Sequence, residues 1–254
     1  MNEVKFRVYR GTKAEGDFQD YTVPLGEGMV VLDAIHHIQA TQAGDLAVRW
    51  NCKAGKCGSC SAEVNGKPRL MCMTRMDVLP LDQPVTIEPI RRFPHIKDLV
   101  CDVQSAYDAN KRIKPLKPQP READGTYRMM QYDIDRIQEF HKCIECFLCQ
   151  DVCHVMRDRQ KFDFIGPRFL VRAASLAMHP LDTEDRLEEL KGEFGLGYCN
   201  ITKCCTEVCP EHIKITDNAI IPLKERVAGN YYDPIAWIFR LFTGRKANTK
   251  GAVH

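Results

Sequence analysis

Four cysteines in the second half of the chain have the spacing needed to bind a metal cluster. Cys143, Cys146, Cys149 and Cys153 follow the pattern C-x2-C-x2-C-x3-C. Thiolates at this spacing bind cubane iron–sulfur clusters, and in two-cluster proteins the fourth cysteine reaches a different cluster from the first three. The run therefore predicts a second cysteine group that supplies the remaining ligands.

A second copy of this spacing lies near the C-terminal end. It consists of Cys199, Thr202, Cys205 and Cys209, with threonine in place of the second cysteine. If each run lends its last cysteine to the other cluster, two ligand sets follow. The first predicts a [4Fe–4S] cluster on Cys143, Cys146, Cys149 and Cys209. The second predicts a [3Fe–4S] cluster, because threonine is a poor iron ligand, and its ligands are Cys153, Cys199 and Cys205.

A third group precedes both runs, with the spacing C-x4-C-x2-C and one later cysteine: Cys52, Cys57, Cys60 and Cys72. This is the plant-type [2Fe–2S] spacing. Gly55 and Gly58 allow the loop, because glycine tolerates the positive φ that a close backbone approach requires. A structural zinc site is the alternative, although zinc sites favour paired C-x2-C units.

Two of the 13 cysteines remain. Cys204 could compete with Cys205 as a ligand, but the spacings to Cys199 and Cys209 favour Cys205. We therefore expect Cys101 and Cys204 to be small buried residues.

The composition narrows the class of protein. The cysteines cluster and their number is odd, which favours metal centres in a reducing compartment over disulfides. The net charge of +2 gives no electrostatic case for nucleic acid. The N-terminus resembles neither a signal peptide nor a transit peptide, and no apolar run approaches a membrane span. Membrane contact is therefore expected through a partner. The chain also lacks a G-x-G-x-x-G fingerprint, so a flavin is expected elsewhere.

The hydrophobic patterns predict an α+β chain in two domains. Strands are expected over residues 4–8, 21–25, 61–64, 68–73 and 85–90, with a helix over 29–40. This order suggests a β-grasp domain over residues 1–106. Three prolines in 114–120 indicate a stiff linker, which we place at 107–120.

The remaining residues, 121–254, are predicted to form a helical domain that carries the two cubane-type clusters. Helices are expected over 133–142, from Pro167 onward, over 182–192 and over 216–227. The apolar tail 237–242 is expected to pack against a partner; packing into the core and an interfacial anchor near the membrane subunit are the alternatives.

Taken in order, these motifs resemble the iron–sulfur subunit of succinate dehydrogenase and fumarate reductase. The resemblance rests on R-W-N-C-K-A-G-K-C-G-S-C at 49–60, the run at 143–153 and C-x5-C-x3-C-P at 199–210. It implies a plant-type ferredoxin domain followed by a bacterial-ferredoxin-like domain. It also implies electron flow from an FAD-bearing flavoprotein through the [2Fe–2S], [4Fe–4S] and [3Fe–4S] clusters to quinone. The quinone would lie at a membrane-anchor subunit, with or without haem.

The chain departs from that family at the quinone end. Many relatives have proline after the fourth cysteine of the second group, where this chain has His154, and histidine where it has Asn200. We therefore expect menaquinone, with His154, Asn200 and Thr202 on the quinone side. A histidine simply hydrogen-bonded to backbone or sulfur is the alternative. The expected location is the cytoplasmic face of a bacterial plasma membrane. The competing functions are fumarate reduction, a related iron–sulfur oxidoreductase, and a structural module without electron transfer.

Overall fold

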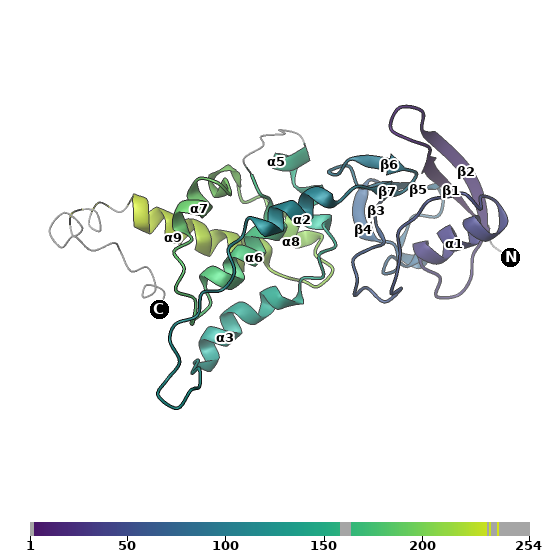
Figure 1. Ribbon diagram of the computed structural model, residues 1–254. Coiled ribbons are helices and arrows are strands. Elements are labelled where there is room, and N and C mark those ends of the chain that lie inside the picture. The colour runs from purple at the N-terminus through teal and green to yellow at the C-terminus, as the bar shows by residue number, and fades with distance from the viewer. Residues whose placement is uncertain (1–2, 158–163, 233, 235–237, 239–254) are drawn as a thin grey trace.

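The computed structural model describes residues 3–157, 164–232, 234 and 238 of the 254-residue chain. Figure 1 shows a β-rich N-terminal part beside a helical C-terminal part, so the α+β prediction is confirmed. Of the tail 237–242, only residue 238 is described. Within the described residues, no helix is long and apolar enough to cross a membrane.

The N-terminal part is built on a mixed sheet with strand order β2-β1-β5-β3-β4. Strands β1 and β5 are parallel, and the other neighbours are antiparallel. The strands of this sheet are β1 (Glu3–Arg10), β2 (Asp17–Pro24), β3 (Ser61–Val64), β4 (Lys67–Leu70) and β5 (Val85–Glu88). All five lie where the alternating pattern predicted strands.

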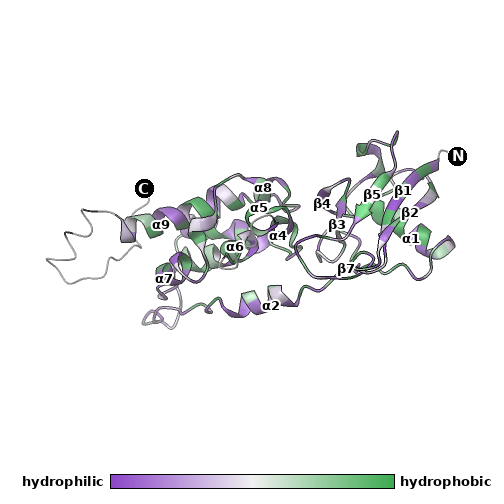
Figure 2. Cartoon of the chain, turned by 90° about the horizontal axis from the view of Figure 1, so that it is seen from above, coloured by the Kyte–Doolittle hydropathy of each residue, from purple (hydrophilic) through white to green (hydrophobic). Residues whose placement is uncertain are grey.

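Helix α1 (Val31–Thr41) buries one apolar face, as its spacing predicted. Leu32, Ile35 and Ile38 on that face share a core with Phe6 and Val8 of β1. Figure 2 shows hydrophobic residues concentrated around β1 and β5. A helix packed on a mixed sheet with parallel β1 and β5 gives the β-grasp arrangement.

A short two-stranded ribbon and a helix join this part to the rest, and the pattern did not predict the ribbon. The ribbon consists of β6 (His95–Lys97) and β7 (Val100–Cys101), and the helix is α2 (Gln104–Lys111). Earlier in the chain, a 3₁₀ turn, η1 (Met76–Val78), precedes β5. The buried Asp98 carboxylate between β6 and β7 accepts hydrogen bonds from the backbone N–H groups of Gly11 (2.6 Å) and Ala47 (2.8 Å). This carboxylate therefore ties the ribbon to the sheet.

The C-terminal part consists of short helices. They are α3 (Gln131–Gln138), η2 (Glu139–Lys142), α4 (Leu148–Val152), α5 (His154–Arg157), α6 (Pro167–Ala177), α7 (Leu187–Lys191), η3 (Leu196–Tyr198), α8 (Cys204–Glu207), η4 (Ile215–Ile220) and α9 (Ile221–Tyr231). Helix α6 starts with Pro167 as predicted. The last predicted helix begins as a π-helical turn, η4, before it continues as α9.

The helix predicted over 182–192 is too long, since only α7 is helical. Asp182 instead accepts a hydrogen bond from the Lys117 backbone N–H at 3.0 Å. Residues Pro118 and Asp182 also form an isolated antiparallel bridge. The start of this segment therefore pairs with the proline-rich stretch instead of extending the helix.

The two parts share core residues across the predicted boundary. Ile90, Phe93 and Val103 pack into the core of the helical part. In the other direction, Cys146 and Leu148 join the core beneath the sheet. The division at residues 107–120 stays a prediction, because the hydrophobic contacts cross it.

Candidate metal-cluster sites

The loop that carries Cys52 folds around its sulfur. The backbone N–H groups of Ala54 and Lys56 each donate to Cys52 Sγ at 3.3 Å. Lys53 and Gly55 in this loop have positive φ values of 55° and 66°. Two donors aimed at one sulfur favour its negatively charged thiolate form. The loop thus fits an anionic iron–sulfur centre.

The other members of this group surround a partly buried site. The pKa of Cys60 is raised to about 12, chiefly by burial; the charges of Cys72 and Cys57 add to this, and a hydrogen bond from the Cys72 backbone opposes it. Burial also raises the pKa of Cys57, but hydrogen bonds from Ser59 and Cys52 outweigh it and bring the pKa to about 6. Cys57 thus interacts with Cys52, and Cys60 interacts with Cys57 and Cys72, so the four predicted ligands lie near one another. Buried thiols of this kind lose their protons when iron binds, because the metal supplies the compensating charge.

The two later runs have the same backbone conformation, which supports the internal repeat. Glu145 and Ile201 hold corresponding positions, with φ of 57° and 62°. Phe147 and Lys203 also correspond, with φ of 62° and 63°, and each precedes a short helix. Four non-glycine residues with positive φ are costly individually. Their recurrence at matched positions shows that both runs wrap a site in the same way.

The first of these runs meets the end of the second. Cys143, Cys146, Cys149 and Cys209 line one pocket. Burial raises the pKa of Cys146 to about 12, with further contributions from the charges of Cys143 and Cys209. The structure therefore brings these four thiols to one pocket, and their assignment as ligands of one cluster stays a prediction.

A separate pocket gathers the cysteines of the last group. It is lined by Cys153, Cys199, Cys204, Cys205 and Thr202. Burial raises the pKa of Cys153 and of Cys205 to about 11, and the charges of Cys204 and Cys199 contribute to both. The pKa of Cys149 is raised mainly by burial, and the charge of Cys205 contributes to the shift. The two later groups are therefore neighbours.

The two remaining cysteines differ in environment. Cys101 is buried as expected, and its thiol donates to the Ile90 carbonyl at 3.3 Å. Cys204 is only half-buried, so the prediction of a buried residue is wrong. The cause is its position as the first residue of α8, which faces the pocket of the last group.

The three predicted quinone-side residues lie together. Asn200 Nδ2 is 2.8 Å from His154 Nε2, and Thr202 Oγ1 is 3.5 Å from His154 Nδ1. The amide therefore donates to Nε2 when the proton is on Nδ1. His154 contacts two side chains, an arrangement that neither the quinone prediction nor its alternative specified.

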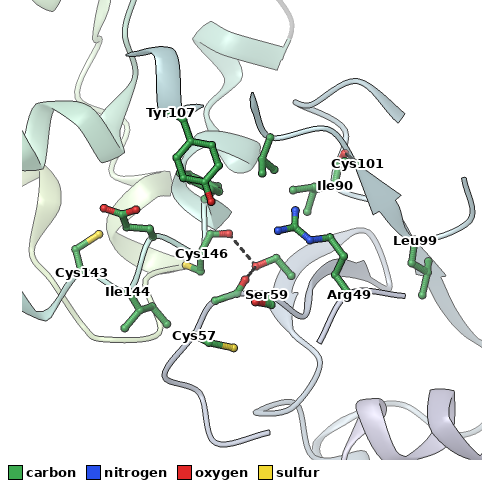
Figure 3. Close-up of a pocket in the computed structure, with 15 residues that line it drawn as sticks. Arg49, Cys57, Ser59, Ile90, Leu99, Cys101, Tyr107, Cys143, Ile144 and Cys146 are labelled. Atoms are coloured by element: carbon green, nitrogen blue, oxygen red, sulfur yellow. Dashed lines mark hydrogen bonds between the residues drawn. The ribbon is translucent and has the colours of Figure 1, made fainter. Parts of the chain in front are cut away.

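The [2Fe–2S]-type loop touches the second cysteine group directly, a contact that the sequence pattern did not reveal. A Cβ atom on Gly58 would lie 2.7 Å from Cys146 Cα. The Ser61 hydroxyl bridges the same two segments, at 2.8 Å from the Cys146 carbonyl and 3.0 Å from the Gly58 carbonyl. Figure 3 shows Cys57, Cys143 and Cys146 around the pocket at this junction.

Within the part of the chain that the structure describes, no three His, Cys, Asp or Glu side chains are gathered as ligands of one metal ion. A cubane holds its thiolates on separate iron atoms, so its ligand sulfurs lie farther apart than those around one zinc ion. The pockets of the second and third cysteine groups are where such ligand sets are expected.

Comparisons with known proteins agree with these groups. A 2Fe-2S iron-sulfur cluster binding domain matches residues 5–108, and a 4Fe-4S dicluster domain matches residues 139–213. The fumarate reductase iron-sulfur subunit of Mycobacterium tuberculosis is 34% identical over 202 residues, which cover 77% of this chain and 80% of the relative. The succinate dehydrogenase iron-sulfur subunit of Bacillus subtilis is 29% identical over 231 residues, which cover 84% of this chain and 88% of the relative.

A solved structure is similar over nearly the whole chain. A chain of the Mycobacterium smegmatis Sdh1 complex in the apo form has 62% identity and a TM-score of 0.88, covering 92% of this chain and 98% of that one. Fold and sites together define an electron-transport protein with a [2Fe–2S] domain followed by a dicluster ferredoxin-type domain. More narrowly, the chain belongs to the iron–sulfur subunits of succinate dehydrogenases and fumarate reductases.

Proposed function

We propose that this chain is the electron-transfer subunit of a succinate:quinone oxidoreductase that works as a succinate dehydrogenase. Electrons enter from a flavoprotein that holds FAD and the succinate site. They pass through [2Fe–2S], [4Fe–4S] and [3Fe–4S] clusters and reach quinone at a membrane-anchor subunit. The ligand sets are Cys52, Cys57, Cys60 and Cys72; Cys143, Cys146, Cys149 and Cys209; and Cys153, Cys199 and Cys205.

The observation that carries this proposal is the unbroken succession of the three cysteine groups. The first meets the second where Gly58 packs on Cys146. The second is joined to the third through α4, which contains Cys149 and ends directly before Cys153. A relay needs its centres close together, and this succession supports that condition.

The proposed direction of electron flow rests on similarity to relatives. The 62% identity to a chain of an Sdh1 complex supports succinate oxidation. The 34% identity to a fumarate reductase subunit supports the reverse reaction as the second candidate. Menaquinone is the proposed acceptor, because Asn200 takes the place of the histidine found in many ubiquinone-using relatives.

The partners and location follow from the same proposal. We place the subunit on the cytoplasmic face of a bacterial plasma membrane, between the flavoprotein and a membrane anchor with or without haem. Neither flavin nor succinate binds this chain in the proposal. His154 and Asn200, which are joined at 2.8 Å, would face the quinone.

Stepwise redox titration of the purified complex, followed by EPR, tests the cluster content. We expect a reduced [2Fe–2S] signal, a reduced [4Fe–4S] signal and an oxidised [3Fe–4S] signal. A zinc-containing, colourless subunit would refute the proposal. Rates of menaquinone reduction by succinate and of fumarate reduction by menaquinol, measured on one preparation, decide the direction. If fumarate reduction by menaquinol is the faster of the two, the chain is a fumarate reductase subunit instead.

A further inference from the structure

The third cysteine group contains one thiol more than its proposed cluster uses. In the repeat, Thr202 corresponds to Cys146, which is a ligand of the second group. Matched φ values at Glu145 and Ile201, 57° and 62°, show that the backbone just before these positions has the same conformation. The Thr202 side chain therefore marks where a fourth ligand would come from.

Cys204 lies at that place. Its sulfur is 3.5 Å from Thr202 Oγ1. It lines the same pocket as Cys153, Cys199 and Cys205. A thiol thus stands beside the threonine that replaces the missing ligand.

The corresponding position in the other run is used differently. Leu148, the repeat partner of Cys204, is 2% exposed and packs into the core beneath the sheet. Cys204 is half-buried and makes no such contact with that core. The side chain at this position therefore lies at the pocket of the last group and not in that core.

We propose that Cys204 is a fourth thiolate ligand of the third cluster, which lets the site take up Fe²⁺ and convert between [3Fe–4S] and [4Fe–4S] forms. This inference rests on the proposed function. The reduced cluster [3Fe–4S]⁰ combines with Fe²⁺ to give [4Fe–4S]²⁺ without a further electron. As the sulfur–iron bond forms, the S–H bond of Cys204 breaks and its proton passes to solvent. From [3Fe–4S]⁺, the one electron required comes from succinate through the relay.

The conversion would change electron delivery. Cluster type is among the factors that set the reduction potential of an iron–sulfur centre. An iron-loaded third cluster should therefore pass electrons to quinone at a different rate from the three-iron form. Cys204 would make the quinone end of the relay responsive to available ferrous iron.

The test uses the whole complex, reduced without oxygen and incubated with ⁵⁷Fe²⁺. We expect the wild type to lose the oxidised [3Fe–4S] EPR signal and to gain one ⁵⁷Fe per complex, seen by Mössbauer spectroscopy. Cys101→Ala, the other cysteine outside the ligand sets, should behave as wild type. Cys204→Ala and Cys204→Ser should keep the [3Fe–4S] signal and take up no ⁵⁷Fe into the cluster.

The outcomes separate the inference from the proposed function. If the untreated wild type lacks a [3Fe–4S] signal but Cys204→Ala shows one, the four-iron form is resident and the inference holds. If neither shows the signal, the proposed third cluster itself is wrong. If the signal is present but iron changes nothing, or if both Cys204 variants take up iron like the wild type, Cys204 is not a ligand. An intact [2Fe–2S] signal verifies that each variant has assembled.

Discussion

Arg157 donates a hydrogen bond to Glu63 at 2.6 Å, across the junction of the two parts of the molecule. Glu63 lies on β3 and is fully buried, while Arg157 ends α5 just after Cys153. A second arginine contacts the same carboxylate: Arg91 Nε lies 3.0 Å from Glu63 Oε2. The sheet is thus joined by a hydrogen bond to the segment between the second and third cysteine groups.

This pair predicts a pH-dependent stability. Burial and the neighbouring Asp151 raise the pKa of Glu63 from 4.5 to about 7, against the opposing effect of Arg157 and Arg91. Between these values the folded chain holds a proton that the unfolded chain has released. The free energy of unfolding therefore falls as the pH rises through this window, by up to about 1.4 kcal/mol per pH unit.

Glu63→Gln should remove most of this slope when thermal unfolding of the complex is followed from pH 5 to pH 7.5. Glu88→Gln provides the control, because Glu88 also pairs with Arg91 but is partly exposed. An unchanged slope in Glu63→Gln would show that another group titrates.

A second prediction concerns the contact between the first two groups. Gly58 and Gly66 have nearly equal φ values, +67° and +70°, but only Gly58 has neighbours that a Cβ would meet. Gly66→Ala should therefore cost only the backbone strain, about 1–2 kcal/mol. Gly58→Ala should cost more, because its Cβ would lie 2.7 Å from Cys146 Cα.

The measurements are the melting temperatures of both variants and the EPR spectra of their clusters. Gly58→Ala should also broaden the [4Fe–4S] signal, whereas Gly66→Ala should leave it unchanged. Equal melting temperatures would show that the loop moves away from Cys146 without cost.

The sequence predicted the parts of the site that depend on spacing alone. Cys209 was assigned to the first run from the internal repeat, and the structure brings it to Cys143 and Cys146. The contacts of Gly58 and Ser61 with Cys146 could not be predicted, because they join residues more than 80 positions apart with no pattern between them. Asp182 shows the same limit within the fold, since its bond to Lys117 overrides a local helical pattern.

Cys153→Ser separates the two later clusters. Cys153 lies in the pocket of the last group, not in the pocket of the second. The variant should lose the oxidised [3Fe–4S] signal and most quinone reduction, while the [4Fe–4S] signal and reduction of a dye that accepts electrons upstream persist. Cys101→Ser is the control and should retain all of these. Loss of both cubane signals would contradict the proposed division of ligands.

The last prediction concerns the anchoring of the proline-rich stretch. Arg186 Nε donates to Asp182 at 2.8 Å, and both side chains are almost fully buried. The same guanidinium donates to the carbonyls of Lys114 and Pro115, at 2.8 and 2.9 Å. Arg186→Met should destabilise the fold by about 3–5 kcal/mol, because it removes a buried guanidinium that pairs with a buried carboxylate.

Arg128→Met is the matched control for that substitution. Arg128 pairs with Asp124 at 2.9 Å, but both side chains are exposed. Exposed pairs contribute about 0.2–1 kcal/mol, since water already solvates both charges. Denaturant unfolding of the two variants should therefore differ several-fold in lost stability. Similar losses would mean that the stretch is held by its backbone pairing with Asp182, and that the Arg186 guanidinium contributes little to it.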